Sequence, residues 1–164
     1  MKTKFKNVFL GIGSNLGNRI RNIELTKFHL HNNKIKILLT SSFFESLSWP
    51  DPLQPKFLNI IIKVQTILSP QDLYSICSNI ETDLGRKKST KNSPRTCDID
   101  IIDYDHIVLK ETIILPHPLM NNRSFVLLPL YEIDKTWKHP ETGTNINKLI
   151  QSLSIKDLRA IKQI

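Results

Sequence analysis

The chain has 164 residues, of which 40% are hydrophobic and 23% charged, a composition typical of one soluble globular domain. No apolar run approaches the roughly 18 residues of a transmembrane helix, and Val8–Ile12 is too short for a signal peptide. The net charge of +8 leaves nucleic acid, a membrane surface or a polyanionic small substrate open as partners. We therefore predict a single domain over residues 1–164 without a membrane span.

The first half of the chain is predicted to contain three strands and one helix. Val8–Gly13 is a short apolar strand, and apolar residues at helical spacing favour a helix from about Leu16 to His31. Aliphatic residues predict strands over 34–44 and 57–67. Residues 46–55 include three prolines, which indicates a long loop of the kind that often carries function.

The glycine-rich turn 11–17 lies between the first strand and the first helix. It is not a dinucleotide fingerprint, because Leu16 occupies the place of the third glycine. It is not a P-loop either, because no Gly-Lys-Ser/Thr follows. A structural turn and a ligand-binding turn both remain open.

The clearest helical pattern begins at Ser69. Ser69 and Asp72 form a capping box, Pro70 suits the first helical position, and Gly85 marks the end. The ten residues that follow, 86–95, have five positive charges and no acidic residue. These charges belong to Arg86, Lys87, Lys88, Lys91 and Arg95. A loop fixed at both ends and rich in cations is predicted to act as a lid that holds phosphates.

The next stretch alternates like a half-buried strand. Cys97, Ile99 and Ile101 alternate with Asp98 and Asp100, so both carboxylates leave the same face, with Cα atoms roughly 6–7 Å apart. Two carboxylates this close repel each other unless a proton or a cation intervenes. A hard divalent ion such as Mg²⁺ binds carboxylates and substrate phosphates together. The basic loop and the paired aspartates therefore predict phosphoryl-type transfer from a nucleotide.

The remaining chain is predicted as a turn over 103–106, a hairpin over 107–115, a helix from Asn122 that Pro129 interrupts, and a helix over 146–153. Asp103 and Asp105 are interpreted as turn residues. His117 stands between two prolines, which restrict where its ring points. The order strand, helix, strand, strand, helix, strand is ferredoxin-like. It predicts an α+β fold with a mostly antiparallel sheet and helices on its faces.

The cysteines match no metal or redox spacing. Cys77 and Cys97 lie in apolar patterns, and we interpret them as core thiols of a protein in the reducing cytoplasm.

Several motifs occur in the order typical of one enzyme family. They are Gly-Ser-Asn-Leu-Gly at 13–17, Ser-Ser-Phe-Phe at 41–44, Phe-Leu-Asn at 57–59, Leu-Gly-Arg at 84–86, Pro-Arg-Thr-x-Asp-x-Asp at 94–100, Pro-His at 116–117 and Asn-Arg-x-Phe at 122–125. On these residues the chain resembles the 6-hydroxymethyl-7,8-dihydropterin pyrophosphokinases of the folate pathway. The resemblance covers nearly the whole chain.

The resemblance implies transfer of the terminal diphosphate of ATP to the pterin's hydroxymethyl group, leaving AMP. It implies that Asp98 and Asp100 bind two Mg²⁺ ions and, with Arg86 and Arg95, form the catalytic group. The implied ATP-binding residues are Arg86, Lys88, Arg95, Thr96, Ile99, His117 and Arg123. The implied pterin-binding residues are Ser46, Leu47, Phe57, Asn59 and Phe125. Glu81, on the helix near the active site, and Trp49 are predicted as supporting residues. ATP and the pterin would be the partners. We predict a monomer, because no apolar surface stripe is left over once the core is assigned, and no binding to nucleic acid or a membrane.

The chain departs from the family at two loops. Lys91-Asn92-Ser93 stands where the family commonly has Arg-Trp-Gly, and the proline-rich loop is altered to Leu47-Ser48-Trp49-Pro50. Trp49 is the candidate replacement for the missing aromatic flap. These changes put loop motion in question, not the reaction.

Other interpretations remain. Phe57 and Phe125 can be core residues, Asn59 a strand-end residue and Glu81 a solvated helix residue. The whole chain can be an impaired relative that binds pterin and nucleotide without turnover, or a basic nucleic-acid module. The latter lacks the aromatic pair of RNA-recognition sheets.

Overall fold

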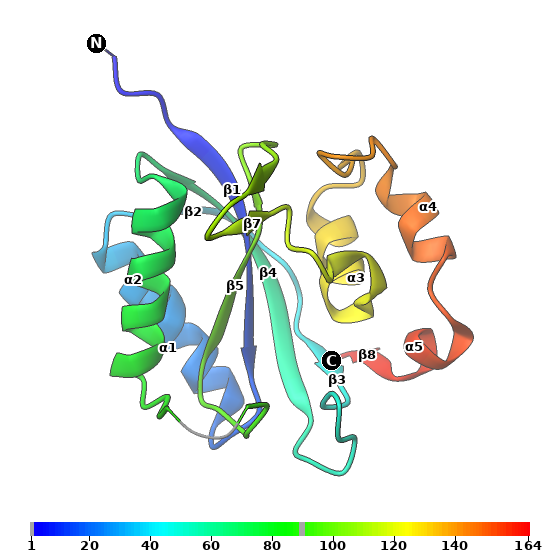
Figure 1. Ribbon diagram of the computed structural model, residues 1–164. Coiled ribbons are helices and arrows are strands. Elements are labelled where there is room, and N and C mark those ends of the chain that lie inside the picture. The colour runs from blue at the N-terminus through cyan, green and yellow to red at the C-terminus, as the bar shows by residue number, and fades with distance from the viewer. Residues whose placement is uncertain (1, 89–90) are drawn as a thin grey trace.

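The computed structural model describes residues 2–88 and 91–164 (Figure 1). Its elements, in chain order, are β1 (Lys6–Ser14), α1 (Arg19–Asn32), β2 (Lys36–Thr40), β3 (Phe44–Ser46), β4 (Phe57–Thr66), α2 (Pro70–Asp83), β5 (Asp98–Tyr104), β6 (Leu109–Lys110), β7 (Ile114–Leu115), a 3-10 turn η1 (Met120–Asn122), α3 (Ser124–Ile133), α4 (Ile146–Gln151), α5 (Ile155–Arg159) and β8 (Ile161–Gln163). In the described part of the chain, no helix is long and apolar enough to cross a membrane.

One antiparallel sheet forms the centre of the molecule. Its strands follow the order β5-β1-β4-β3-β8. Strand β2 pairs with the second half of β4, on the same side of β4 as β3. β6 and β7 form the expected separate hairpin. Helices α1 and α2 cover one face of the sheet, and α3 and α4 lie on the other (Figure 1). The ferredoxin-like α+β prediction is therefore confirmed.

Strand alternation divides the apolar side chains between two cores. Leu10, Ile60 and Ile99 face α1 and α2, whereas Ile61 and Ile102 face α3 and α4. The sheet is thus buried on both faces, which fixes the register of its strands.

Both cysteines belong to the first core. Cys77 and Cys97 are free and buried, as predicted, and burial raises the pKa of each thiol to about 12.

The predicted strand over 34–44 is wrong as a single element, because the structure divides it into β2 and β3. Ser41 lies at the break. Its backbone N–H donates to the Ile61 carbonyl at 2.9 Å, and its hydroxyl accepts from the Ile61 N–H at 2.9 Å. A side chain thus replaces a backbone acceptor in the ladder, and the strand changes course there.

Two predictions in the second half of the chain are corrected. Asp103 and Tyr104 belong to β5 rather than to a turn, because the buried Asp103 carboxylate accepts hydrogen bonds from Trp137 Nε1 at 2.8 Å and from the His106 backbone at 3.0 Å. Such partners offset the cost of burying a charge. Pro129 does not interrupt the helix, since α3 continues through it and buries it. Helix α5 and strand β8 were not predicted.

Candidate active site

A cleft of about 560 Å³ opens beside the ends of β1, β4 and β5 where β5 begins. Its walls come from the loop after β3, the start of β4, the segment before β5, β5 itself, the η1–α3 region and α5. Its lining includes the predicted residues Ser46, Leu47, Trp49, Phe57, Asn59, Arg95, Asp98, Asp100, Arg123 and Phe125. The structure therefore brings together most of the residues that sequence reasoning selected.

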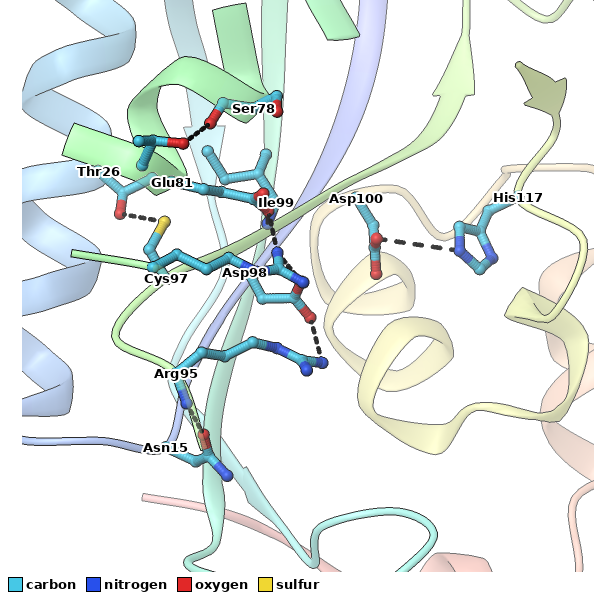
Figure 2. Close-up of polar contacts among 12 residues, drawn as sticks. Asn15, Thr26, Ser78, Glu81, Arg95, Cys97, Asp98, Ile99, Asp100 and His117 are labelled. Carbon is cyan, nitrogen blue, oxygen red and sulfur yellow. Dashed lines mark hydrogen bonds and ion pairs between the residues drawn. The ribbon is translucent and has the colours of Figure 1, made fainter. Parts of the chain in front are cut away.

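The two aspartates of β5 face the cleft, as the alternation predicts, while Ile99 and Ile101 pack in the first core. Asp98 contacts two arginines: Arg86 Nη1 lies 3.0 Å from its Oδ1, and Arg95 Nη2 lies 3.0 Å from its Oδ2. Figure 2 shows Arg95 reaching across to this carboxylate. Both oxygens of Asp98 are thus engaged by cations that a bound anion can attract away.

Asp100 has looser partners. Arg123 Nη1 is 3.7 Å from its Oδ2, and His117 Nε2 is 4.0 Å from its Oδ1, beyond ordinary hydrogen-bond distance (Figure 2). Burial, and then the neighbouring Asp98, raise the pKa of Asp100 to about 7. This carboxyl therefore takes up a proton more readily than an ordinary aspartate. An added positive charge in the cleft would restore its ionised form.

These observations fit a hard cation. Asp98 and Asp100 present oxygen ligands on one face, and Asp100 needs positive charge. Among residues 2–88 and 91–164, no group of three or more His, Cys, Asp or Glu side chains could hold a metal. The remaining ligands for Mg²⁺ would have to be phosphate oxygens and water, which is the usual arrangement for this ion.

His117 is held beside Asp100 as a neutral donor. Its backbone N–H donates to the Ile102 carbonyl at 2.9 Å, which ties the segment to β5. Its Nδ1 accepts the Leu119 N–H at 3.2 Å, so the ring proton lies on Nε2. Burial, and then Arg123, lower the pKa of His117 to about 4. At pH 7 the ring therefore presents a neutral Nε2–H toward Asp100, although His117 is not among the described residues that line the cleft.

Glu81 links helix α2 to strand β5. Its Oε1 accepts the Ile99 N–H at 2.7 Å and contacts Arg86 Nη1 at 2.8 Å. Burial raises the pKa of Glu81, although the Ile99 N–H and Arg86 counteract this. Arg86 is thus fixed between Glu81 and Asp98, so Glu81 is not a solvated helix residue.

The opposite wall contains the residues predicted to bind a flat ring. Strand β4 begins at Phe57, and the buried Asn59 lies two residues further along it. Arg95 lies 5.3 Å from the ring centroid of Phe57, and Arg123 lies 5.5 Å from that of Phe125. Each aromatic ring therefore already has a guanidinium on one face, a favourable cation–π arrangement.

Gly13 lies between the two halves of the site. In the sheet register it pairs with Asn59 on one side and with Asp98 on the other. A Cβ at this position would lie 3.2 Å from Asn59 Oδ1 and 3.4 Å from Phe57 Cδ1. The absent side chain leaves room for Asn59 and Phe57, the two residues predicted to bind a ring.

Asn15 is a site residue that sequence reasoning missed. Its N–H donates to the Arg95 carbonyl at 3.0 Å, and its Oδ1 accepts the Arg95 N–H at 2.8 Å (Figure 2). Its Nδ2 donates to Ser48 Oγ at 3.2 Å and to the Pro55 carbonyl at 3.1 Å. One buried side chain thus joins the glycine turn, the basic segment and the loop after β3. The Gly-Ser-Asn motif was the available signal.

Some predicted residues lie away from the cleft. Lys88 is exposed and lies outside the described set that lines it. Thr96 Oγ1 donates to the Leu84 carbonyl at 2.6 Å, closing the end of α2. The Ile99 side chain is in the core and its N–H is bound by Glu81, which restricts any ATP contact to its carbonyl. Ser89 and Thr90, in the predicted lid, lie outside the described residues.

The altered loops contribute residues to the cleft. Asn92, which stands in the family's tryptophan position, lines it, and its backbone has a positive φ of 65°. Trp49 also lines it and is 71% exposed. Residues from outside any recognised motif also line the cleft, among them Lys156, Asp157 and Ala160.

Comparison with known proteins identifies relatives of the chain. Residues 9–135 match a family model described as 7,8-dihydro-6-hydroxymethylpterin-pyrophosphokinase (HPPK). The chain is 37% identical over 134 residues to the 2-amino-4-hydroxy-6-hydroxymethyldihydropteridine pyrophosphokinase of Aquifex aeolicus, covering 81% of this chain and 83% of that protein. It is 39% identical over 155 residues to the folic acid synthesis protein fol1 of Pneumocystis carinii, covering 94% of this chain but 21% of that protein.

The chain thus spans about a fifth of the fol1 protein and most of the Aquifex enzyme. Among solved structures, Plasmodium falciparum HPPK-DHPS A437G with pteroate superimposes with a TM-score of 0.74 at 15% identity, over 99% of this chain and 47% of that one. At this identity the likeness supports the fold alone.

Proposed function

Because the chain belongs to the 7,8-dihydro-6-hydroxymethylpterin-pyrophosphokinase family, we propose that it transfers the terminal diphosphate of ATP to 6-hydroxymethyl-7,8-dihydropterin in folate synthesis. The pterin hydroxymethyl oxygen forms a bond to the β-phosphorus. The bond from that phosphorus to the oxygen bridging it to the α-phosphate breaks. AMP leaves with the bridging oxygen, and the hydroxyl proton is released. The observation that carries the proposal is the pair Asp98 and Asp100, which faces a cleft with cations on one side and Asn59 with Phe57 on the other.

Asp98 and Asp100 would hold two Mg²⁺ ions, which would polarise the transferring phosphoryl group and lower the pKa of the attacking hydroxyl. The contacts of Asp98 imply an exchange of partners when MgATP binds. Arg86 and Arg95, which neutralise Asp98 without ligand, turn to the phosphate oxygens. The positive charge that Asp98 loses would be replaced by that of Mg²⁺, and the guanidinium groups would gain the phosphate oxygens as new anionic partners.

The other polar groups orient the nucleotide. His117 Nε2–H donates to a phosphate oxygen without adding charge, because its pKa of about 4 keeps it neutral. Arg123, near Asp100, supplies a further cation. Contacts of Lys88, Thr96 and Ile99 with ATP remain predictions. With this arrangement the reaction depends on positioning and charge neutralisation rather than on a strong protein base.

The pterin would occupy the wall formed by Phe57, Asn59 and Phe125, with Ser46, Leu47 and Trp49 at its border. Each aromatic contact with a flat heterocycle contributes about 0.5–1.5 kcal/mol beyond burial of area. The Asn59 side chain lies deep enough to bind the ring edge, since it is 6% exposed.

A monomeric state, a cytoplasmic location and the lack of nucleic-acid binding also remain predictions.

The test is the product formed from ATP, Mg²⁺ and 6-hydroxymethyl-7,8-dihydropterin. We expect AMP in the complete mixture and none with EDTA or without the pterin. ADP in place of AMP would refute diphosphate transfer. Pterin binding without any nucleotide product would instead identify an impaired relative. Asn92 and Ser93, where the chain departs from the family, would then be changed first.

A further inference from the structure

Strand β8 pairs with β3 on the side away from β4. Ser46 lies opposite Ile161, and Phe44 lies opposite Gln163. The Ile164 N–H extends the pairing with a 3.1 Å hydrogen bond to the Phe43 carbonyl. Figure 1 shows this last strand lying against β3 after α5. Helix α5 and strand β8 lie beyond position 135, where the match to the family model ends.

Strand β3 supplies both acceptors for the Asn59 side-chain amide. Asn59 Nδ2 donates to the Phe44 carbonyl at 3.2 Å and to Ser46 Oγ at 2.9 Å. An amide nitrogen has two hydrogens, so both are used. The opposite amide orientation would place Oδ1 against the Phe44 carbonyl, and two acceptors repel. The Phe44 carbonyl therefore sets the orientation, and Asn59 Oδ1 is the atom left for a ligand.

This orientation depends on where β3 lies. β3 is three residues long, and its own pairing with β4 is equally short. Without β8, its outer side would be an edge of unpaired backbone groups, and so short a strand has little stability of its own. With β8 it is paired on both sides. Helix α5, which leads into β8, also lines the cleft through Lys156 and Asp157, as does Ala160 directly after it.

We propose that β8 is a positioning element for the pterin half of the site: it holds β3 so that Asn59 presents Oδ1 to a ring edge bearing N–H donors. This inference rests on the proposed function and extends it to a segment outside the family match. Because β8 acts through β3 and Asn59, loosening it weakens pterin binding while leaving the ATP side, on β5 and the basic segment, largely unaffected.

The test compares two substitutions at one exposed position. Lys162 lies opposite Glu45 in the β8–β3 register. Lys162→Pro removes a backbone donor and constrains φ within the short strand, whereas Lys162→Ala keeps the backbone intact. We expect the proline variant to raise the KM for pterin about 10-fold, because Phe44 and Ser46 would no longer hold Asn59 in place and small misplacements are costly. Its KM for ATP and its kcat at saturating pterin should stay within about twofold of wild type, and the alanine variant should match wild type.

A wild-type pterin KM in a folded Lys162→Pro chain would overturn the proposal. An equal rise in both KM values would also overturn it, since that result means general loosening. Should the proline variant not fold, hydrogen exchange on the wild-type chain decides. Pterin alone should slow exchange of the Ile164 amide, because coupling between two sites is reciprocal. Unchanged exchange at saturating pterin would contradict the inference. Failure of the proposed function is separate, since wild type itself would then form no AMP.

Discussion

Gly13→Ala tests how closely the two halves of the site are fitted together. The added Cβ would lie 3.2 Å from Asn59 Oδ1, nearer than ordinary van der Waals contact allows without adjustment, and 3.4 Å from Phe57 Cδ1, at the limit of ordinary contact. The position is on β1, opposite Asn59 and Asp98, so the backbone has little freedom to withdraw. We expect Asn59 and Phe57 to move by a few tenths of an ångström.

The size of the effect follows from that displacement. A misplacement of about 1 Å can cost on the order of 100-fold, so on a logarithmic scale a shift of about 0.3 Å should cost about fourfold. A fourfold weaker affinity corresponds to about 0.8 kcal/mol. The loss should fall on pterin, whose proposed contacts are the displaced atoms. The Kd for an ATP analogue should change by less than about twofold.

Gly11→Ala provides a matched control on the same strand. Its Cβ would lie 3.5 Å from methyl groups of Ile102 and Ile61, an ordinary contact. Both variants remove a glycine from β1, and each should gain about 0.5–1 kcal/mol in the free energy of unfolding from the lost chain flexibility. Pterin affinity would be measured by titrating the ring's fluorescence, with thermal unfolding of both variants in parallel.

Equal pterin affinity in Gly13→Ala and Gly11→Ala would refute this reasoning, because it would mean that Asn59 and Phe57 tolerate the added methyl group or do not bind pterin. A large loss of ATP affinity in Gly13→Ala would also contradict it, because the displacement would then reach Asp98.

Three further changes test other parts of the site. Asp98→Asn should lower kcat by at least about 100-fold while pterin titration stays near wild type, and turnover close to wild type would dismiss the carboxylate's role. Because folding lowers the pKa of His117 from 6.5 to about 4, the unfolded chain takes up its proton first, so the free energy of unfolding should fall as pH drops from about 6.5 to about 4. Denaturant unfolding at both pH values should show a smaller fall in His117→Gln, and an identical fall would count against this assignment. Asn15→Ala should destabilise the chain by about 1–3 kcal/mol in the same measurement and raise the KM for ATP, because Arg95 loses its anchor; an unchanged KM would show that Arg95 is held otherwise.

The sequence predicted the reactive face because strand periodicity alone determines it. Asp98 and Asp100 alternate with apolar residues, and burial of Ile99 and Ile101 forces both carboxylates into the cleft. The capping residues around Ser69 likewise gave α2 its correct start, since the hydrogen bond to the Asp72 N–H is local.

What the sequence did not reveal depends on partners far along the chain. β8 is three residues long and exists because β3 lies beside it, so no periodicity marks it. Asp103 has the composition of a turn residue, and it is buried because Trp137, 34 residues later, donates to it. The Gly-Ser-Asn motif marks Asn15, but its role follows only from its contacts with Arg95 and Pro55, which lie far along the chain.

The two cysteines have a practical consequence for studying loop motion. A thiol reacts as its thiolate, and with a pKa of about 12 only about one part in ten thousand of each thiol is ionised at pH 8. Both are also buried, so alkylating dyes should not label them in the folded chain. A cysteine introduced by Trp49→Cys would then be the single labelled position. A fluorophore there would report movement of the loop over the cleft without removal of any native residue from the core.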